Sequence, residues 1–203
     1  MSKKKNKVKF GLKNVHYAPV TFAADGTPSF DTPIPIPGAV NLSLNRNGET
    51  LVFYADDGVY FELANNSGFN GDLEIALVPE SFRTGPLGET LDENGVLTEG
   101  AEQEMQHFAL LFEFTEDVKA VRHVLYNCTA SQNEVSGATR GENIEVQTEK
   151  LSLNARPLPG GGPVKVKTGE TTTDAVYDGW YDSVYYPSAD GGDETTGDET
   201  TGS

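Results

Sequence analysis

QHFALLFEF (Gln106–Phe114) and VRHVLYNCTA (Val121–Ala130) are two apolar stretches, rich in aromatic and branched aliphatic residues, in the middle of this 203-residue sequence. Residue types of this kind favour extended backbone, and each stretch has the length of an ordinary strand. Only a short polar segment separates them. We therefore predict that the two stretches form neighbouring strands at the centre of a β-structure.

The same alternation of apolar and polar residues recurs on both sides of this pair. Asn47-Gly48, Asp57-Gly58 and Asn94-Gly95 are turn signals, and the first predicts a hairpin between the strands on either side of it. Pro79 is well placed to begin one short helix that runs through Phe82. Residues Thr173–Tyr186 are ambiguous between helix and strand. The sequence therefore predicts an all-β fold with one short helix, a sandwich or barrel whose further strands cover Lys7–Phe22, Ala39–Leu44, Leu51–Tyr54, Val59–Leu63, Asp72–Val78, Ile144–Ala155 and Val164–Lys167.

Charge divides the chain into three parts. The net charge is −16, yet residues 1–13 contain six of the 15 basic residues and no acid. Residues 187–203 are acidic and of low complexity, and we expect them to be disordered because they have almost nothing apolar to bury. The predicted organisation is a basic N-terminal arm (1–13), a β domain (14–186) and an acidic tail (187–203). The lysines of the arm are Lys3, Lys4, Lys5, Lys7, Lys9 and Lys13.

The segment Ala23–Pro37 contains four prolines and the turn pair Asp25-Gly26. Proline cannot donate a ladder hydrogen bond, so this segment cannot be a central strand. We expect an extended loop. It is long for a connection within a compact domain, and this length suggests a functional role.

The sequence lacks the common motifs of catalytic, phosphate-binding and metal-binding sites. It contains no Gly-x-Ser-x-Gly elbow, phosphate-binding glycine loop or His-Glu-x-x-His, and its three histidines are scattered. Asp92-Glu93-Asn94-Gly95 matches a calcium loop only in part, and the single cysteine, Cys128, predicts a small buried side chain on a strand. We expect no enzymatic activity, no metal site and no cofactor. A strongly acidic chain also will not bind nucleic acid tightly, and the absence of a long apolar run predicts a protein made in the cytoplasm without a membrane segment.

An aromatic cluster near the C-terminus has two readings. It can form a platform for a sugar, or it can pack a terminal segment onto the core or onto a neighbouring subunit. Packing is the commoner role of such a cluster. Its members are Tyr177, Trp180, Tyr181, Tyr185 and Tyr186.

The order of several segments resembles the major tail proteins of non-contractile phages of Gram-positive bacteria. The resemblance covers roughly residues 7–186. It is carried by VKFGLKNVHYAPV (8–20), PGAVNLSL (37–44), YADDGVYF (54–61), GDLEIALVP (71–79), LGETLDENGVL (87–97) and RHVLYNC (122–128).

The resemblance implies a structural virion protein. Tail tube subunits are β-sandwiches or barrels with a flanking helix; six form a ring around a channel, and rings stack through terminal and loop extensions. The implied partners are other copies of the chain, the tape-measure protein, the tail terminator and distal tail proteins, and double-stranded DNA that passes without specific binding. The implied location is the tail of the virion, after synthesis in the bacterial host cytoplasm.

On this interpretation three groups of residues are candidates for assembly. The lysines of the arm would reach an acidic face of a neighbouring subunit, and the proline-rich loop would bridge two rings. Several acids would line the channel or an interface. The loop candidates are Asp25, Pro28, Phe30, Pro33 and Pro35, and the acids are Glu49, Asp56, Asp57 and Glu62.

Two other functions are open at this point. A phage decoration or baseplate protein would keep the β fold, remain a monomer or trimer, and bind a host glycan through the aromatic cluster. An acidic hydrolase would lose activity when one carboxylate pair is neutralised. A tube protein is distinguished from both because it forms rings or filaments as its concentration rises.

Overall fold

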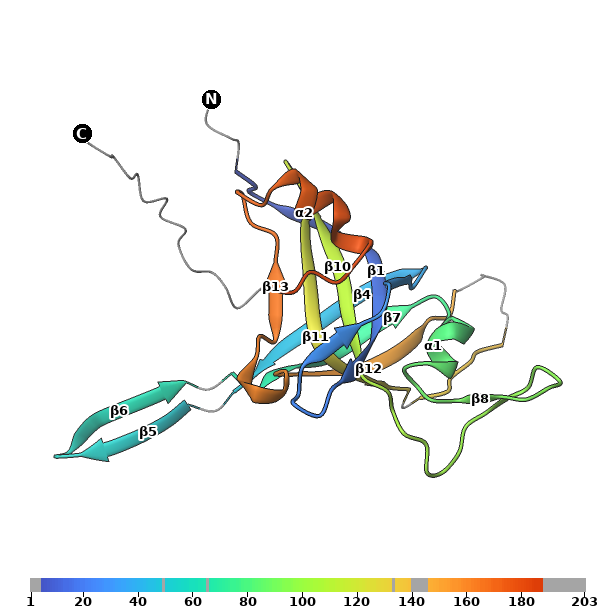
Figure 1. Cartoon of the computed structure of the whole chain (residues 1–203), viewed down its shortest axis with the longest axis horizontal. Helices are drawn as coiled ribbons and strands as arrows, with labels where there is room; N and C mark the ends of the chain where they lie inside the picture. Colours follow the sequence, from blue (N-terminus) through green and yellow to red (C-terminus); the bar gives the residue numbers. More distant parts are fainter. Residues whose placement is uncertain (1–4, 49, 65, 133, 140–145, 188–203) are drawn as a thin grey trace, which may run out of the picture.

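The computed structural model describes residues 5–48, 50–64, 66–132, 134–139 and 146–187, and within them the protein is predominantly β (Figure 1). One antiparallel sheet forms the body, in the strand order β2-β1-β10-β11-β12-β7-β4, with β13 paired to β11 and β3 paired to β1. The all-β prediction with a short helix is confirmed. The strands of this sheet are β1 (Lys9–Phe22), β2 (Pro28–Phe30), β3 (Ile34–Pro35), β4 (Ala39–Asn47), β7 (Gly68–Ile75), β10 (Phe108–Glu116), β11 (Val121–Ser131), β12 (Glu149–Arg156) and β13 (Lys165–Lys167).

β10 and β11 lie at the centre of the sheet and are covered on both faces. Along β10, Phe108, Leu110 and Phe112 point into the main core, whereas Ala109 and Leu111 point into a second core on the opposite face. A strand buried on both faces needs a continuous apolar run, and QHFALLFEF supplies one. This explains why these two stretches were the strongest signal in the sequence.

A short helical segment covers each of the two cores. Helix α1 (Glu80–Thr84) follows Pro79 and buries Phe82 against Tyr17 and Phe108, with ring centroids 5.0 and 5.4 Å apart. On the other face, α2 (Asp174–Asp178) and a 3-10 turn (Gly179–Tyr181) bury Trp180 in the second core. The ambiguous segment near the C-terminus is therefore helical where it meets the sheet.

Strands β5 (Thr50–Ala55) and β6 (Gly58–Ala64) form a separate hairpin that projects from the body (Figure 1). The predicted Asn47-Gly48 hairpin between β4 and β5 is wrong, because β4 pairs with β7 and β5 pairs only with β6. β4 and β7 can close on each other because Gly71 lies against the backbone of Ser43, where a Cβ would be 1.8 Å from the carbonyl oxygen. A glycine-permitted close approach of this kind overrides a local turn signal.

The Asp57-Gly58 and Asn94-Gly95 turns are both present. Asp56 and Asp57 occupy the tip of the β5–β6 hairpin with φ angles of 51° and 58°. Two successive residues in the left-handed region form the turn that best matches strand twist, and aspartate tolerates this region. Asn94-Gly95 connects two short strands, β8 (Thr90–Leu91) and β9 (Leu97–Thr98).

The proline-rich segment is less extended from the body than predicted. β2 pairs with the end of β1, and β3 pairs with its middle, so much of Ala23–Pro37 lies along β1 of the same chain. Pro28 and Phe30 belong to β2, Pro35 belongs to β3 and Pro33 is buried. Asp25 accepts a hydrogen bond from the backbone N–H of Thr27 in the intervening turn. Proline is tolerated here because these are short strands at the sheet margin.

The basic arm is also shorter than predicted. β1 begins at Lys9, so Lys9 and Lys13 belong to the sheet, opposite Glu116 and Glu113 of β10. Before the strand, the backbone N–H of Lys7 donates to Asp117, and Lys5 lies 3.6 Å from Glu170. Lys3 and Lys4, like the acidic tail from residue 188 onward, lie outside the described residues.

Candidate functional site

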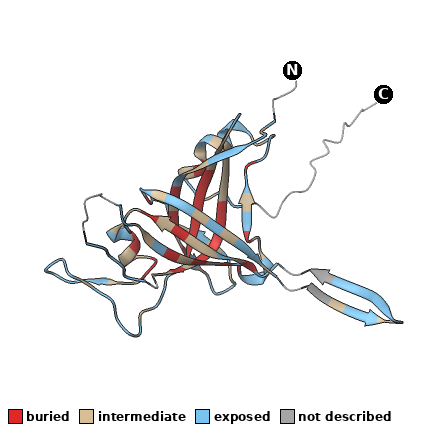
Figure 2. Ribbon diagram, turned by 180° about the vertical axis from the view of Figure 1, so that it is seen from behind, coloured by how far each residue is buried: buried red, intermediate tan, exposed pale blue. Residues whose placement is uncertain are grey.

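The β5–β6 hairpin exposes a group of large apolar side chains to solvent (Figure 2). Phe53 and Phe61 are cross-strand neighbours, and Tyr60, whose ring lies 6.3 Å from that of Phe53, is 71% exposed. Because consecutive residues of a strand point to opposite faces, the run Val59-Tyr60-Phe61 makes both faces of the ribbon apolar. A two-stranded hairpin is marginally stable by itself in water, and exposed apolar patches of this kind mark interaction sites.

Three of the four acids predicted for a lumen or an interface lie on this hairpin. Asp56 and Asp57 form the turn, and Glu62 is exposed on β6. Glu49 lies outside the described residues. The hairpin therefore carries an acidic tip on an aromatic stem.

The sheet, α2 and the loops around them line a half-open cleft of about 930 Å³, which we call the lysine cleft. It receives side chains from the start of β1, the β10–β11 turn, β13 and α2. Four of its lining residues are lysines, which is a high proportion in a chain with only 15 basic residues. They are Lys9, Lys119, Lys165 and Lys167.

The acids of the cleft neutralise only part of this charge. Lys119 lies 3.8 Å from Asp174, and Glu170 pairs with Lys5. Among the described residues, Lys9, Lys165 and Lys167 form no ion pair, although Glu116 also lines the cleft. Lys9 lies 4.0 Å from the centroid of the Phe114 ring and Lys165 lies 4.7 Å from that of Phe69. The lining of the cleft is therefore positively charged on balance.

His123 also lines the cleft, and the charges of its lysines affect the pKa of the imidazole. Its ring is stacked on Phe112 with centroids 5.0 Å apart and an interplanar angle of 5°. Burial, followed by the charges of Lys165, Lys167 and Lys9, lowers its pKa to about 4. Stacking therefore holds the ring, since its buried Nδ1 has no hydrogen-bond partner within the described part of the chain.

Replacing His123 with phenylalanine should reduce the loss in the free energy of unfolding that occurs as the pH falls below 6.5. In the folded protein the pKa is about 4, below its unfolded value of 6.5, so the stabilising contribution is complete above pH 6.5 and is lost as the pH falls toward 4. Allowing for partial solvent screening, we expect wild type to lose about 2 kcal/mol more than His123→Phe over this range. Urea unfolding at pH 7 and pH 4.5 measures the difference. Equal losses in both proteins would show that His123 titrates normally.

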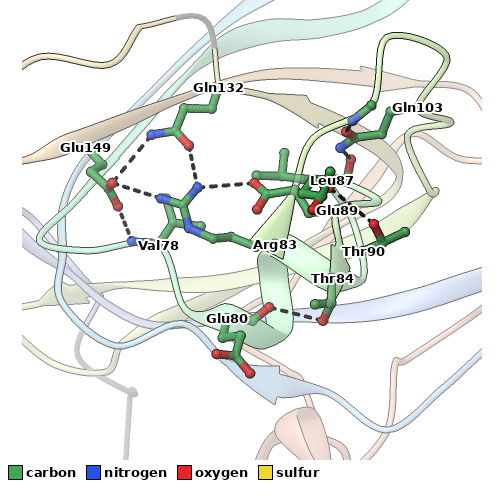
Figure 3. Close-up of polar contacts among 12 residues, drawn as sticks. Val78, Glu80, Arg83, Thr84, Leu87, Glu89, Thr90, Gln103, Gln132 and Glu149 are labelled. Carbon is green, nitrogen blue, oxygen red and sulfur yellow. Dashed lines mark hydrogen bonds and ion pairs between the residues drawn. The ribbon is translucent and has the colours of Figure 1, made fainter. Parts of the chain in front are cut away.

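Two polar clusters hold the body together. In the first, Arg83 joins α1 to the sheet: its guanidinium contacts Glu89 at 3.2 Å, Gln132 at 2.9 Å and Glu149 at 2.9 Å (Figure 3). Glu149 also accepts the backbone N–H of Val78. Because these partners satisfy one another, the cluster fixes the helix against β12.

The second cluster attaches the C-terminal segment to β10. Buried Glu113 accepts hydrogen bonds from Arg122 at 3.1 Å, Asn14 at 2.9 Å and Tyr181 at 3.3 Å. Burial and the neighbouring Glu113 carboxylate raise the pKa of Tyr181. Arg122 also donates to the carbonyl of Tyr177 and stacks on its ring at 3.8 Å. Neither cluster is predictable from the sequence, because the members of each come from separate parts of the chain.

The C-terminal aromatic cluster packs on the sheet of its own chain. Trp180 is buried, and Tyr185 stacks on it at 5.6 Å. The hydroxyl of Tyr126 donates to the carbonyl of Tyr185 at 2.7 Å, which ties the segment to β11. Of the two readings, the structure favours packing over a sugar platform.

Cys128 is a buried strand residue, as predicted, and burial raises its pKa to about 12. In the turn that partly matches a calcium loop, Asp92 accepts the backbone N–H groups of Asn94 and Val96. Across the described ranges, no group of three or more His, Cys, Asp or Glu side chains is arranged to hold a metal ion.

None of the helices in the described part of the chain has the length and apolar character needed to cross a membrane.

Comparison with known proteins adds no relative: no protein-family model and no curated protein matches the chain.

Proposed function

We propose that this protein is a structural subunit that assembles into hexameric rings, and that the rings stack into the tail tube of a long, non-contractile-tailed phage. The sequence resemblance suggests this function, and an all-β body with a projecting hairpin suits it. The tube would be a passage for double-stranded DNA, with the tape-measure, terminator and distal tail proteins as further partners. The location would be the virion tail, after synthesis in the bacterial host.

The projecting β5–β6 hairpin is the observation that carries the proposal. It exposes aromatic side chains on both faces and, among the described residues, pairs with no strand of the main sheet. A feature of this kind gains stability when another surface covers it. Since the described residues of its own chain leave it uncovered, a second copy is the simplest partner.

The edge of the main sheet supports the same conclusion. β4 is the last strand of the sheet order, so its outer backbone groups have no strand partner among the described residues. An unpaired edge invites association, and a closed ring of subunits would cover it. Contacts between two different patches of one surface produce rings when the rotation closes.

The charge is compatible with a conduit for DNA. With a net charge of −16, most of the surface repels phosphate. A negatively charged wall would let a polyanion slide instead of retaining it.

Sedimentation velocity of the purified wild-type chain tests the proposal. We expect a species of six subunits, followed by larger multiples, as the concentration rises. A monomer at every concentration, together with retention on a glycan array, would instead support a glycan-binding decoration module.

A further inference from the structure

We infer that the lysine cleft of one copy receives the acidic tip of the β5–β6 hairpin of a second copy. This inference rests on the self-assembly proposed above and names the surface that receives the hairpin. The hairpin and the cleft are separate features of the molecule. The hairpin tip is acidic, whereas the cleft is lined by lysines.

Charge complementarity is the first argument. Asp56 and Asp57 are both exposed at the tip and form no ion pair with another described residue. Three lysines of the cleft likewise form no ion pair in the described ranges, namely Lys9, Lys165 and Lys167. On a surface with a net charge of −16, most positions repel an acidic turn, so a positively charged cleft is selective for it.

Shape and apolar contact give the second argument. The cleft volume of about 930 Å³ is near the upper end of the range for ligand pockets, roughly 300–1,000 Å³, so it has room for a turn of a few residues. Val118 and Tyr177 line it beside the lysines. The residues that flank the turn, Tyr54 and Val59, are exposed and apolar. Burying them against Val118 and Tyr177 would add to the electrostatic attraction.

The arrangement of the fold gives the third argument. The hairpin points away from the body, whereas α2 and the start of β1, which frame the cleft, lie at the other end of the sheet (Figures 1 and 2). The hairpin of one subunit is therefore presented to the cleft of another. Such a contact joins two different patches and leaves one hairpin and one cleft free in every dimer, so it propagates into a ring or a filament.

A double-mutant cycle tests the contact. Asp56→Asn/Asp57→Asn removes the charge and keeps the turn, because asparagine also accepts the left-handed conformation. Lys165→Glu/Lys167→Glu reverses the charge of the cleft. Light scattering measures the concentration at which half of the protein is assembled. We expect this concentration to rise at least tenfold for the hairpin variant and more than a hundredfold for the cleft variant.

The combined variant gives the decisive comparison. It should assemble at a lower concentration than the cleft variant alone, because neutral asparagines no longer meet the reversed charges; two independent sites would instead add their losses. Glu93→Gln/Glu102→Gln and Lys150→Glu/Arg156→Glu make the same charge changes at exposed positions elsewhere, and should assemble like wild type. Thermal unfolding checks that each variant folds.

The outcomes separate the inference from the proposed function. If wild type assembles and the cleft variant assembles equally well, the docking contact is wrong while self-assembly stands. If deletion of residues 188–203 has the effect expected for the hairpin variant, and the hairpin variant has none, the acidic tail is the occupant and the inference is overturned. If wild type never assembles, the proposed function fails, and the inference fails with it.

Discussion

Replacing Phe53 and Tyr60 with serine should raise the concentration needed for assembly by about a thousandfold, taking about 2 kcal/mol for each aromatic anchor of an interface. Both side chains are more than half exposed, and they contact each other on the hairpin. In the proposed hexamer, these two aromatic side chains would be buried against a neighbouring copy. Serine keeps the extended backbone but has almost no apolar area to bury. The measurement is light scattering across a dilution series.

The fold of the single subunit should be unaffected by this change. Neither residue belongs to either core, and β5 pairs only with β6. The melting temperature should therefore stay close to that of wild type. A matched control is Leu77→Ser/Val96→Ser, which removes two exposed apolar side chains outside the hairpin. Equal assembly by the hairpin variant and the control would mean that the hairpin is not an assembly surface.

Arg122→Leu should lower the free energy of unfolding by about 3–5 kcal/mol, the usual cost of breaking a buried ion pair by removing one partner. The change leaves the buried Glu113 carboxylate without its cation, and it also removes the contact with Tyr177. We therefore expect both the sheet and the attachment of α2 to weaken. Urea unfolding at neutral pH measures the loss.

The double variant Glu113→Gln/Arg122→Leu separates charge from packing. Because it leaves no uncompensated carboxylate, it should be more stable than Arg122→Leu alone. Asn14 and Tyr181 can still hydrogen-bond to the glutamine. If the two variants lose the same stability, packing of the Arg122 side chain is the dominant contribution, not the ion pair.

Much of the fold could be predicted from the sequence because the strongest signals are local. β10 and β11 are apolar on both faces, and the Asp57-Gly58 and Asn94-Gly95 turns depend on a few adjacent residues. The pairing of β4 with β7 could not be predicted. It depends on Gly71, across which two backbones approach closely, and no local pattern reports such a long-range contact.

The candidate site was predictable only in part. Asp56 and Asp57 were identified by their turn, but the aromatic stem beside them was interpreted as ordinary strand residues. The lysine cleft combines Lys9, Lys119 and Lys165 from three separate segments, the first and last of which are 156 residues apart in the chain, and only the folded sheet brings them together. The arm and loop residues were identified by composition, which does not reveal that β1 begins at Lys9 or that β2 and β3 pair with it.

Negative-stain electron microscopy of the concentrated wild-type protein tests the central claim most directly. Self-assembly through the hairpin predicts hollow rings of six subunits and tubes of uniform width built from stacked rings. Dispersed single particles at every concentration, with no ring among them, would contradict it.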